Sequence, residues 1–194
     1  MNLNKLFSIF LLCISLNVFT ADKQSYKPLI SELLSAIQAG PDNSPSVTRA
    51  KEIITLFAAK SVSLEKQYNG STLLGLAALH GNYSVVECLC ENGAIINARM
   101  RSDSTALHQA ASIGCYTTVT TLLRHQANPA LLTTAEQTPL HRALISIASD
   151  VAIALIDAGS PLDIADNFGN TPLSLALEKD MTVVVAYIQY KQRT

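Results

Sequence analysis

Apolar residues recur along most of the chain with a fixed phase of 33 residues. Each unit begins with a threonine, followed by small apolar residues at helical spacing, and a second apolar segment comes about ten residues later. The pattern predicts two short helices in every unit. The threonines are Thr72, Thr105, Thr138 and Thr171, and the second segments begin at Val85, Val119, Val151 and Val183.

The residues around each threonine favour a helix start and a closely packed stack. Threonine is a good N-cap, and Pro139 and Pro172 fall at the first helical position, where the missing N–H is harmless. One unit cannot bury both of its faces, so the units must stack on each other to form a core. Small residues recur in phase where neighbouring helices approach, at Ala77, Ala110, Ala143 and Ala176.

The two ends of the repeating region differ from its middle. Residues 26–65 suggest a divergent first unit, with helices expected over 29–39 and 47–58 and a loop over 40–45. Both terminal units are expected to act as caps. The predicted organisation is a cap over 26–65, repeats over 66–98, 99–131 and 132–164, and a second cap over 165–194.

This pattern resembles the ankyrin repeat family over about residues 66–190. The segments that carry the resemblance include Thr105-Ala-Leu-His-Gln-Ala-Ala111 and Thr138-Pro-Leu-His-Arg-Ala-Leu144. The resemblance implies an all-α solenoid of about five stacked helix–turn–helix units joined by β-hairpin-like loops. It also implies a protein-binding scaffold, and structural hydrogen bonds from His108 and His141 to the unit threonine and nearby backbone.

Some positions depart from the family pattern. Gly75 and Ser174 replace the usual histidine, and Ile147 and Asp180 replace the glycine between the two helices. Gln126 replaces the glycine that ends the second helix, which costs about 1 kcal/mol if its φ is positive. These changes weaken single units without breaking the period.

The first residues of the chain have the layout of a secretory signal peptide. Lys5 precedes an apolar run from Leu6 to Leu16, which is too short to cross a bilayer, and a more polar stretch follows. We expect a signal peptide over 1–21, cut after Thr20 or Ala21, and a mature domain over 22–194. This predicts export to a periplasm or to the extracellular space without stable membrane insertion, although an uncleaved anchor is the alternative.

Charge and composition narrow the range of partners. The net charge is -1, aromatic residues make up 6 % of the chain, and tryptophan is absent. Nucleic-acid binders usually show a basic face or an aromatic stacking platform, so we expect no nucleic-acid partner.

The sequence contains no pattern that indicates catalysis. There is no G-x-S-x-G or H-E-x-x-H segment and no glycine-rich phosphate loop. The spacing of Cys88, Cys90 and Cys115 does not match a zinc site, and both Cys88 and Cys90 are expected to be small buried residues. We therefore expect no enzyme activity, cofactor or metal, with a Cys115–His108 dyad as the remaining catalytic alternative.

The resemblance places partner binding on a concave face made of the loop tips and the adjacent first helices. The best anchors are Tyr68, Arg101 and Phe168, because aromatic and arginine side chains dominate interfaces and loop tips have little core to fill. For Ile113 and Ile145 the alternative is packing on neighbouring loops. The expected tip residues are Tyr68, Asn69, Arg101, Ser102, Thr134, Asn167 and Phe168, and the expected helix residues are Leu79, His80, Ile113 and Ile145.

The sequence thus predicts an exported, non-catalytic scaffold that holds a protein partner. The alternative is an inhibitor, immunity-type or accessory protein that acts on a secreted or periplasmic enzyme.

Overall fold

A computed structural model describes residues 26–39 and 45–193. In this part of the chain there are ten α-helices and one 3-10 turn, and the only β-pairing is an isolated bridge between Tyr68 and Ser71. The helices are α2 (Lys27–Gln38), α3 (Pro45–Ala59), α4 (Leu73–Leu79), α5 (Tyr83–Glu91), α6 (Ala106–Ser112), α7 (Tyr116–Arg124), α8 (Pro139–Ile145), α9 (Ser149–Asp157), α10 (Pro172–Glu178) and α11 (Thr182–Lys191), with η1 at Arg101–Asp103.

The contacts of the chain divide it into two units, Met1–Glu32 and Leu33–Thr194. Only residues 26–32 of the first unit are described, and they form the beginning of α2. The signal peptide expected over 1–21, its cleavage point, and residues 40–44 of the expected loop lie outside the described residues.

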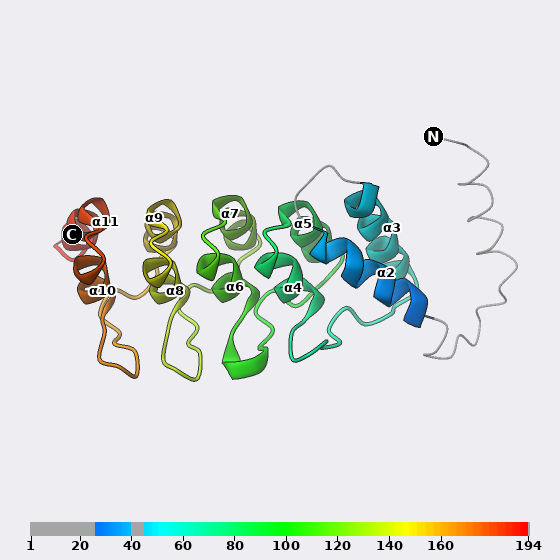
Figure 1. Cartoon of the computed structure of the whole chain (residues 1–194), viewed down its shortest axis with the longest axis horizontal. Coiled ribbons are helices and arrows are strands. Elements are labelled where there is room, and N and C mark those ends of the chain that lie inside the picture. Colours follow the sequence, from blue (N-terminus) through cyan, green and yellow to red (C-terminus); the bar gives the residue numbers. More distant parts are fainter. Residues whose placement is uncertain (1–25, 40–44, 194) are drawn as a thin grey trace, which may run out of the picture. The chain divides into compact units, whose positions relative to one another are not determined.

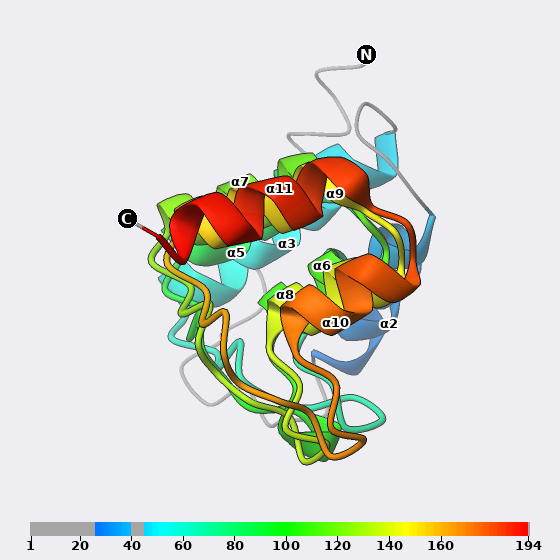
Figure 2. The same ribbon diagram turned by 90° about the vertical axis from the view of Figure 1, so that its left-hand side faces the viewer.

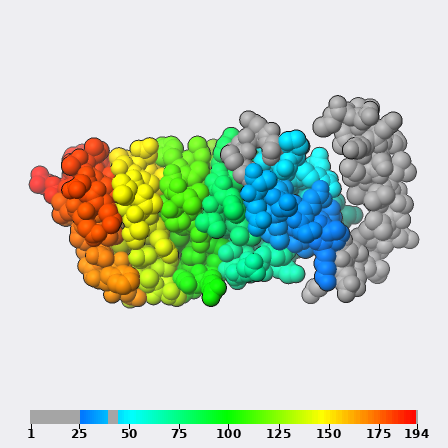
Figure 3. Space-filling view, in the orientation of Figure 1, coloured from blue at the N-terminus to red at the C-terminus, as the bar shows by residue number. Residues whose placement is uncertain are grey.

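The second unit contains two columns of helices. An inner column is formed by α4, α6, α8 and α10, and an outer column by α3, α5, α7, α9 and α11, with each helix packed on the next in its column (Figures 1 and 2). Each inner helix also packs on the outer helix that follows it in the chain. Figure 3 shows the successive helix pairs as bands in chain order. The predicted all-α repeat fold is confirmed.

The inner helices begin where the threonines predict. The hydroxyl oxygens of Thr72, Thr138 and Thr171 each accept a hydrogen bond from the backbone N–H three residues later. Thr105 is held by its pair with the His108 ring, 2.9 Å away. The in-phase alanines of these helices are completely buried, so the inner column packs closely through small side chains.

In the repeat that begins at Thr72, a methionine fills the space that the missing histidine would occupy. A Cβ added to Gly75 would clash with Sδ of Met100, which belongs to the next loop. The Thr72 hydroxyl lies 3.6 Å from the same sulfur and can donate to it. Gly75 and Met100 therefore form a matched pair, and methionine suits such an irregular gap because its side chain is flexible.

Gln126 adopts a left-handed conformation, with a φ of 66°. Glycine at this position should stabilise the protein by about 0.5–1 kcal/mol, because the strain on a side chain at positive φ exceeds the extra entropy of unfolded glycine. Urea unfolding of Gln126→Gly measures this gain. The matched control is Gly159→Ala, at φ 85° in the next unit, which should be destabilising. A loss of stability in Gln126→Gly would contradict the argument.

Candidate protein-binding faces

The tips of the four long loops are joined into one row by backbone hydrogen bonds. The N–H of Arg101 donates to Gly70 O at 2.8 Å, and the N–H of Thr134 donates to Ser102 O at 3.0 Å. The last tip continues the series, because the N–H of Asn167 donates to Ala135 O at 3.1 Å. We call residues 66–71, 99–104, 133–137 and 163–170 the tip row. Figure 2 shows its loops projecting together, on one side of the helices.

Phe168 is the most exposed large apolar side chain of the described residues, at 79 %. Its backbone is nonetheless fixed, since the carboxylate of the buried Asp166 accepts hydrogen bonds from the N–H groups of Phe168 and Asn170 at 3.0 and 2.9 Å. The same carboxylate accepts a bond from the Gln137 amide at 3.1 Å. The loop thus holds an aromatic ring in solvent on a rigid support.

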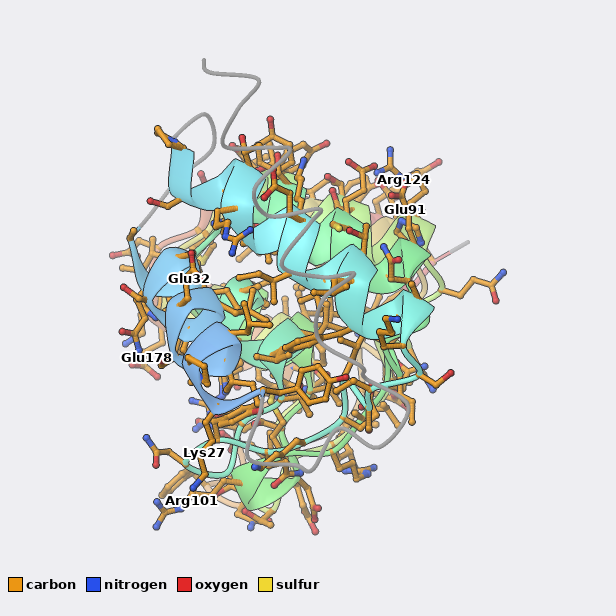
Figure 4. The ribbon with its side chains drawn as sticks, turned by 90° about the vertical axis from the view of Figure 1, so that its right-hand side faces the viewer. Lys27, Glu32, Glu91, Arg101, Arg124 and Glu178 are labelled. Atoms are coloured by element: carbon orange, nitrogen blue, oxygen red, sulfur yellow. The ribbon has the colours of Figure 1, made fainter. Side chains whose placement is uncertain are left out.

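The other two expected anchors lie at the opposite end of the tip row. Arg101 is exposed, and Figure 4 shows it at the loop end of the molecule, far from Arg124 of the outer column. Tyr68 is half-buried, with the Lys66 ammonium 5.5 Å from its ring centre. Partial burial raises the pKa of the Tyr68 hydroxyl, so Tyr68 remains a neutral hydrogen-bond donor.

Charge changes sign along the tip row. The first two tips carry Lys66, Arg99 and Arg101 with one acid, Asp103, whereas the last two carry only acids. The guanidinium of Arg99 is tethered, because it donates to Leu132 O at 2.8 Å. The acids of the last two tips are Glu136, Asp163 and Asp166.

Two buried histidines support the tips from below. His108 accepts a bond from the Thr105 N–H at Nδ1, and its Nε2 lies 3.0 Å from Gln137 O of the next loop. His141 repeats this geometry with Thr138, and its Nε2 lies 3.1 Å from Asn170 O. These are the structural bonds that the family resemblance implies. Burial lowers the pKa of His141 and lowers that of His108 to about 4, so both rings are neutral.

The expected helix residues do not lie beside the tips. Leu79, His80, Ile113 and Ile145 occupy the C-terminal ends of inner helices, next to the turns that lead into the outer column. The seven residues of each inner helix separate them from the tips, which precede the first residue of that helix. The expected site residues therefore form two rows, which remain predictions as binding sites.

The second row contains three side chains that sequence reasoning missed. Tyr83, Tyr116 and Ile147 are exposed beside Leu79, Ile113 and Ile145. The available signal was their phase, since both tyrosines occupy the first position of an outer helix and Ile147 replaces a turn glycine. Ile113 lies close to the neighbouring turn at Gly81, but much of its side chain stays exposed. The alternative that Ile113 serves only to pack on a neighbouring loop therefore accounts for part of its surface.

The thiols are not arranged for chemistry. Cys88, Cys90 and Cys115 form no disulfide with each other. Cys88 is buried as expected and Cys90 is half-buried, and desolvation raises the pKa of both thiols, that of Cys90 to about 11. Because a reactive cysteine needs a lowered pKa, neither is a nucleophile at neutral pH. The His108 ring is already committed to Thr105 and Gln137, so it is not oriented as a base for Cys115.

The described residues lack both a metal-binding cluster and a helix that could span a membrane. They contain no group of three or more His, Cys, Asp or Glu side chains that could hold a metal ion. None of their helices combines the length and the apolar character needed to span a bilayer.

Comparison with known proteins supports the fold. The family model described as "Ankyrin repeats (3 copies)" matches residues 33–133 and 107–192. An ankyrin repeat protein of Fowlpox virus (strain NVSL) is 34 % identical over 135 residues, which is 65 % of this chain and 40 % of the viral protein. A Danio rerio protein whose name describes a palmitoyltransferase is 31 % identical over 150 residues, 76 % of this chain but 22 % of that protein.

A third relative is closer in size. Cyclin-dependent kinase inhibitor 2A of Monodelphis domestica is 32 % identical over 126 residues, 64 % of this chain and 72 % of the inhibitor. The chain thus spans less than half of the first two relatives and most of the third. Repeats of this type generally mediate protein–protein interaction. Because the family model matches most of the chain and the helices stack in two columns, the chain belongs to the ankyrin repeat family.

Proposed function

We propose that the protein is an exported, non-catalytic scaffold that holds a protein partner along its tip row. The observation that carries this proposal is the set of three anchors, the exposed Phe168 and Arg101 and the half-buried Tyr68, on loops that backbone hydrogen bonds fix in register. Rigid loops lose little entropy on binding, so their anchors contribute more of their contact energy to affinity. Aromatic and arginine side chains are the usual centres of such interfaces.

The charge of the tip row orients the partner. Lys66, Arg99 and Arg101 favour an acidic segment at the first two tips, whereas Glu136 and Asp163 favour a basic segment at the last two. Complementary charges chiefly improve specificity and the rate of association, while the anchors supply most of the affinity. The partner therefore carries charge of opposite sign at its two ends and offers apolar pockets for Phe168 and Tyr68.

The proposed destination rests on the N-terminal segment. A single positive charge, a short apolar run and small residues near Thr20 and Ala21 are typical of a cleaved secretory signal. A periplasm and the extracellular space both fit this signal. The fold suits such a destination because its core, built from repeat-to-repeat packing, needs no disulfide.

The proposal predicts that partner capture depends on the three anchors. The partner is first identified by crosslinking the native protein and mass spectrometry, and its Kd is then measured by calorimetry. Replacing Tyr68, Arg101 and Phe168 together by serine should raise the Kd at least tenfold, since truncated hot-spot residues often cost more than about 1.4 kcal/mol each.

The matched control changes three exposed residues of the outer column, Glu91, Arg124 and Tyr190, to serine. This control should leave the Kd unchanged, and circular dichroism should show both variants folded. An unchanged Kd in the anchor variant would place the partner elsewhere on the molecule.

A second candidate is an inhibitor, immunity-type or accessory protein for a secreted or periplasmic enzyme. It is favoured by the relative named as a cyclin-dependent kinase inhibitor, 72 % of whose length this chain matches. Coexpression with a neighbouring exported enzyme should then suppress that enzyme, and the anchor variant should restore its activity. Unchanged enzyme activity in both cases would leave only the scaffold.

A further inference from the structure

A strip of exposed apolar side chains follows the turns between inner and outer helices. We call Leu79, Tyr83, Ile113, Tyr116, Ile145 and Ile147 the turn strip. Their exposed fractions lie between 38 % and 60 %, and they come in pairs from three consecutive turns. They lie at the ends of the inner helices away from the tip row, so this face is separate from the one proposed above.

The turn strip is continuous from one turn to the next. A Cβ on Gly81 would lie 3.5 Å from Cδ1 of Ile113, which belongs to the following turn. A Cβ on Gly114 would likewise lie 3.1 Å from the Cβ of Ala148 in the turn after that. Adjacent turns therefore pack closely against each other along the strip.

Ile147 is strained as well as exposed. Its φ is 58°, in the left-handed region that a β-branched residue strongly disfavours, and 60 % of its surface is accessible. The corresponding residues of the two preceding turns are Gly81 and Gly114, which adopt this conformation without strain. Ile147 weakens the isolated molecule and buries little in return, a pattern that points to a binding contact.

The turn strip carries no charge of its own. Its six members are all apolar or aromatic. The inner helices α4, α6 and α8 end at this edge, and the outer helices α5, α7 and α9 begin there, so opposite ends of helix dipoles lie together and cancel. Two such surfaces therefore meet without electrostatic repulsion, which makes a second copy of the chain a suitable occupant.

The area of the turn strip is sufficient for a weak dimer. The six exposed side chains offer roughly 600 Å² of surface per copy, so a pair of copies buries about 1,200 Å² in total, at the lower limit of standard specific interfaces. The neighbouring Thr117 and Ser146 are also exposed. We propose that the turn strip is the interface of a symmetric homodimer, a role that goes beyond the proposed partner binding.

The three turns define the register of this dimer. A two-fold axis at the middle turn pairs Tyr116 with Tyr116 of the second copy, because an isologous interface places identical residues at its centre. The first turn, with Leu79 and Tyr83, then faces the third turn of the second copy, with its Ile147.

Sedimentation velocity of the purified protein, from about 1 to about 300 μM, tests this proposal over the range of weak dimers. We expect a concentration-dependent shift from monomer to dimer, and a dimer Kd at least tenfold higher for Tyr116→Ser combined with Ile147→Ser. The matched control is Ile95→Ser with Tyr190→Ser, which removes exposed apolar residues outside the turn strip and the tip row and should leave the dimer intact.

Ile147→Gly separates binding from folding. At concentrations where the protein is monomeric, this variant should unfold at a higher temperature than the parent, because its strain is relieved. It should nevertheless weaken the dimer at least tenfold. A merely structural role for Ile147 would not produce these opposite changes.

A protein that stays monomeric up to the highest concentration overturns the proposal. So does flotation of the monomer with vesicles of phosphatidylethanolamine and phosphatidylglycerol, which would assign the turn strip to a lipid surface. Neither result bears on the tip row, because the anchor variant tests that row separately.

Discussion

Alanine in place of His141 is expected to lower the free energy of unfolding by about 3 kcal/mol. The side chain is completely buried, and its ring joins the start of α8 to the next loop through Thr138 and Asn170. Truncation leaves a cavity in the stack and removes the hydrogen-bond partner of Asn170 O, a half-buried acceptor. It also removes one half of the capping box at Thr138.

Urea unfolding monitored by circular dichroism measures this loss. His80→Ala is the matched control, because His80 is exposed at the end of an inner helix, and its effect should stay within about 0.5 kcal/mol. A loss below 1 kcal/mol for His141→Ala would show that the loop does not depend on this bond.

Lowering the pH from 6.5 to 4 is expected to reduce the free energy of unfolding of the parent protein by about 3 kcal/mol through His108 alone. Burial holds the pKa of His108 at about 4 in the folded protein, whereas the unfolded chain binds the proton near the ordinary value of 6.5. In this window the unfolded state carries more protons, so stability rises with pH. The contribution is complete above pH 6.5 and is lost as the pH falls to 4.

The lowered pKa of His141 acts in the same direction. The free energy of unfolding is therefore measured at half-unit steps from pH 7 to 4 for the parent and for His108→Gln. The variant is less stable at pH 7, but its slope against pH should be clearly smaller. Equal slopes would show that His108 is not buried neutral in the folded protein.

The regular part of the fold was accessible from the sequence because a local rule determines it. A threonine whose oxygen accepts the N–H three residues later starts a helix wherever it stands, and Thr72, Thr138 and Thr171 do so. The positive φ at Gln126 was likewise implied by the glycine in the same phase of neighbouring units. Periodicity turns one unit into a template for the others.

Departures from the period were harder to interpret, since their meaning depends on another unit. Gly75 suggested a weakened repeat, but the side chain that replaces the histidine is Met100, from the loop of the next unit. No local pattern links these two positions. The pairing became visible only when the loop was placed against the inner helix.

The candidate faces show the same boundary. Phase placed Phe168 and Arg101 at loop tips, and both are exposed there. Tyr83 and Tyr116 were not singled out from the sequence, although both side chains are exposed. Exposure depends on the turns that stack on either side, so a one-dimensional pattern does not report it.

The loops are tied to each other through main-chain groups, which every residue possesses. Arg101, Thr134 and Asn167 each hold the preceding loop with a backbone N–H, whatever their side chains are. Substitution of these side chains therefore preserves the hydrogen bonds between the loops while it changes the chemistry of the exposed surface. Divergent descendants of one such gene can acquire unrelated targets by a few substitutions, with no new architecture to evolve.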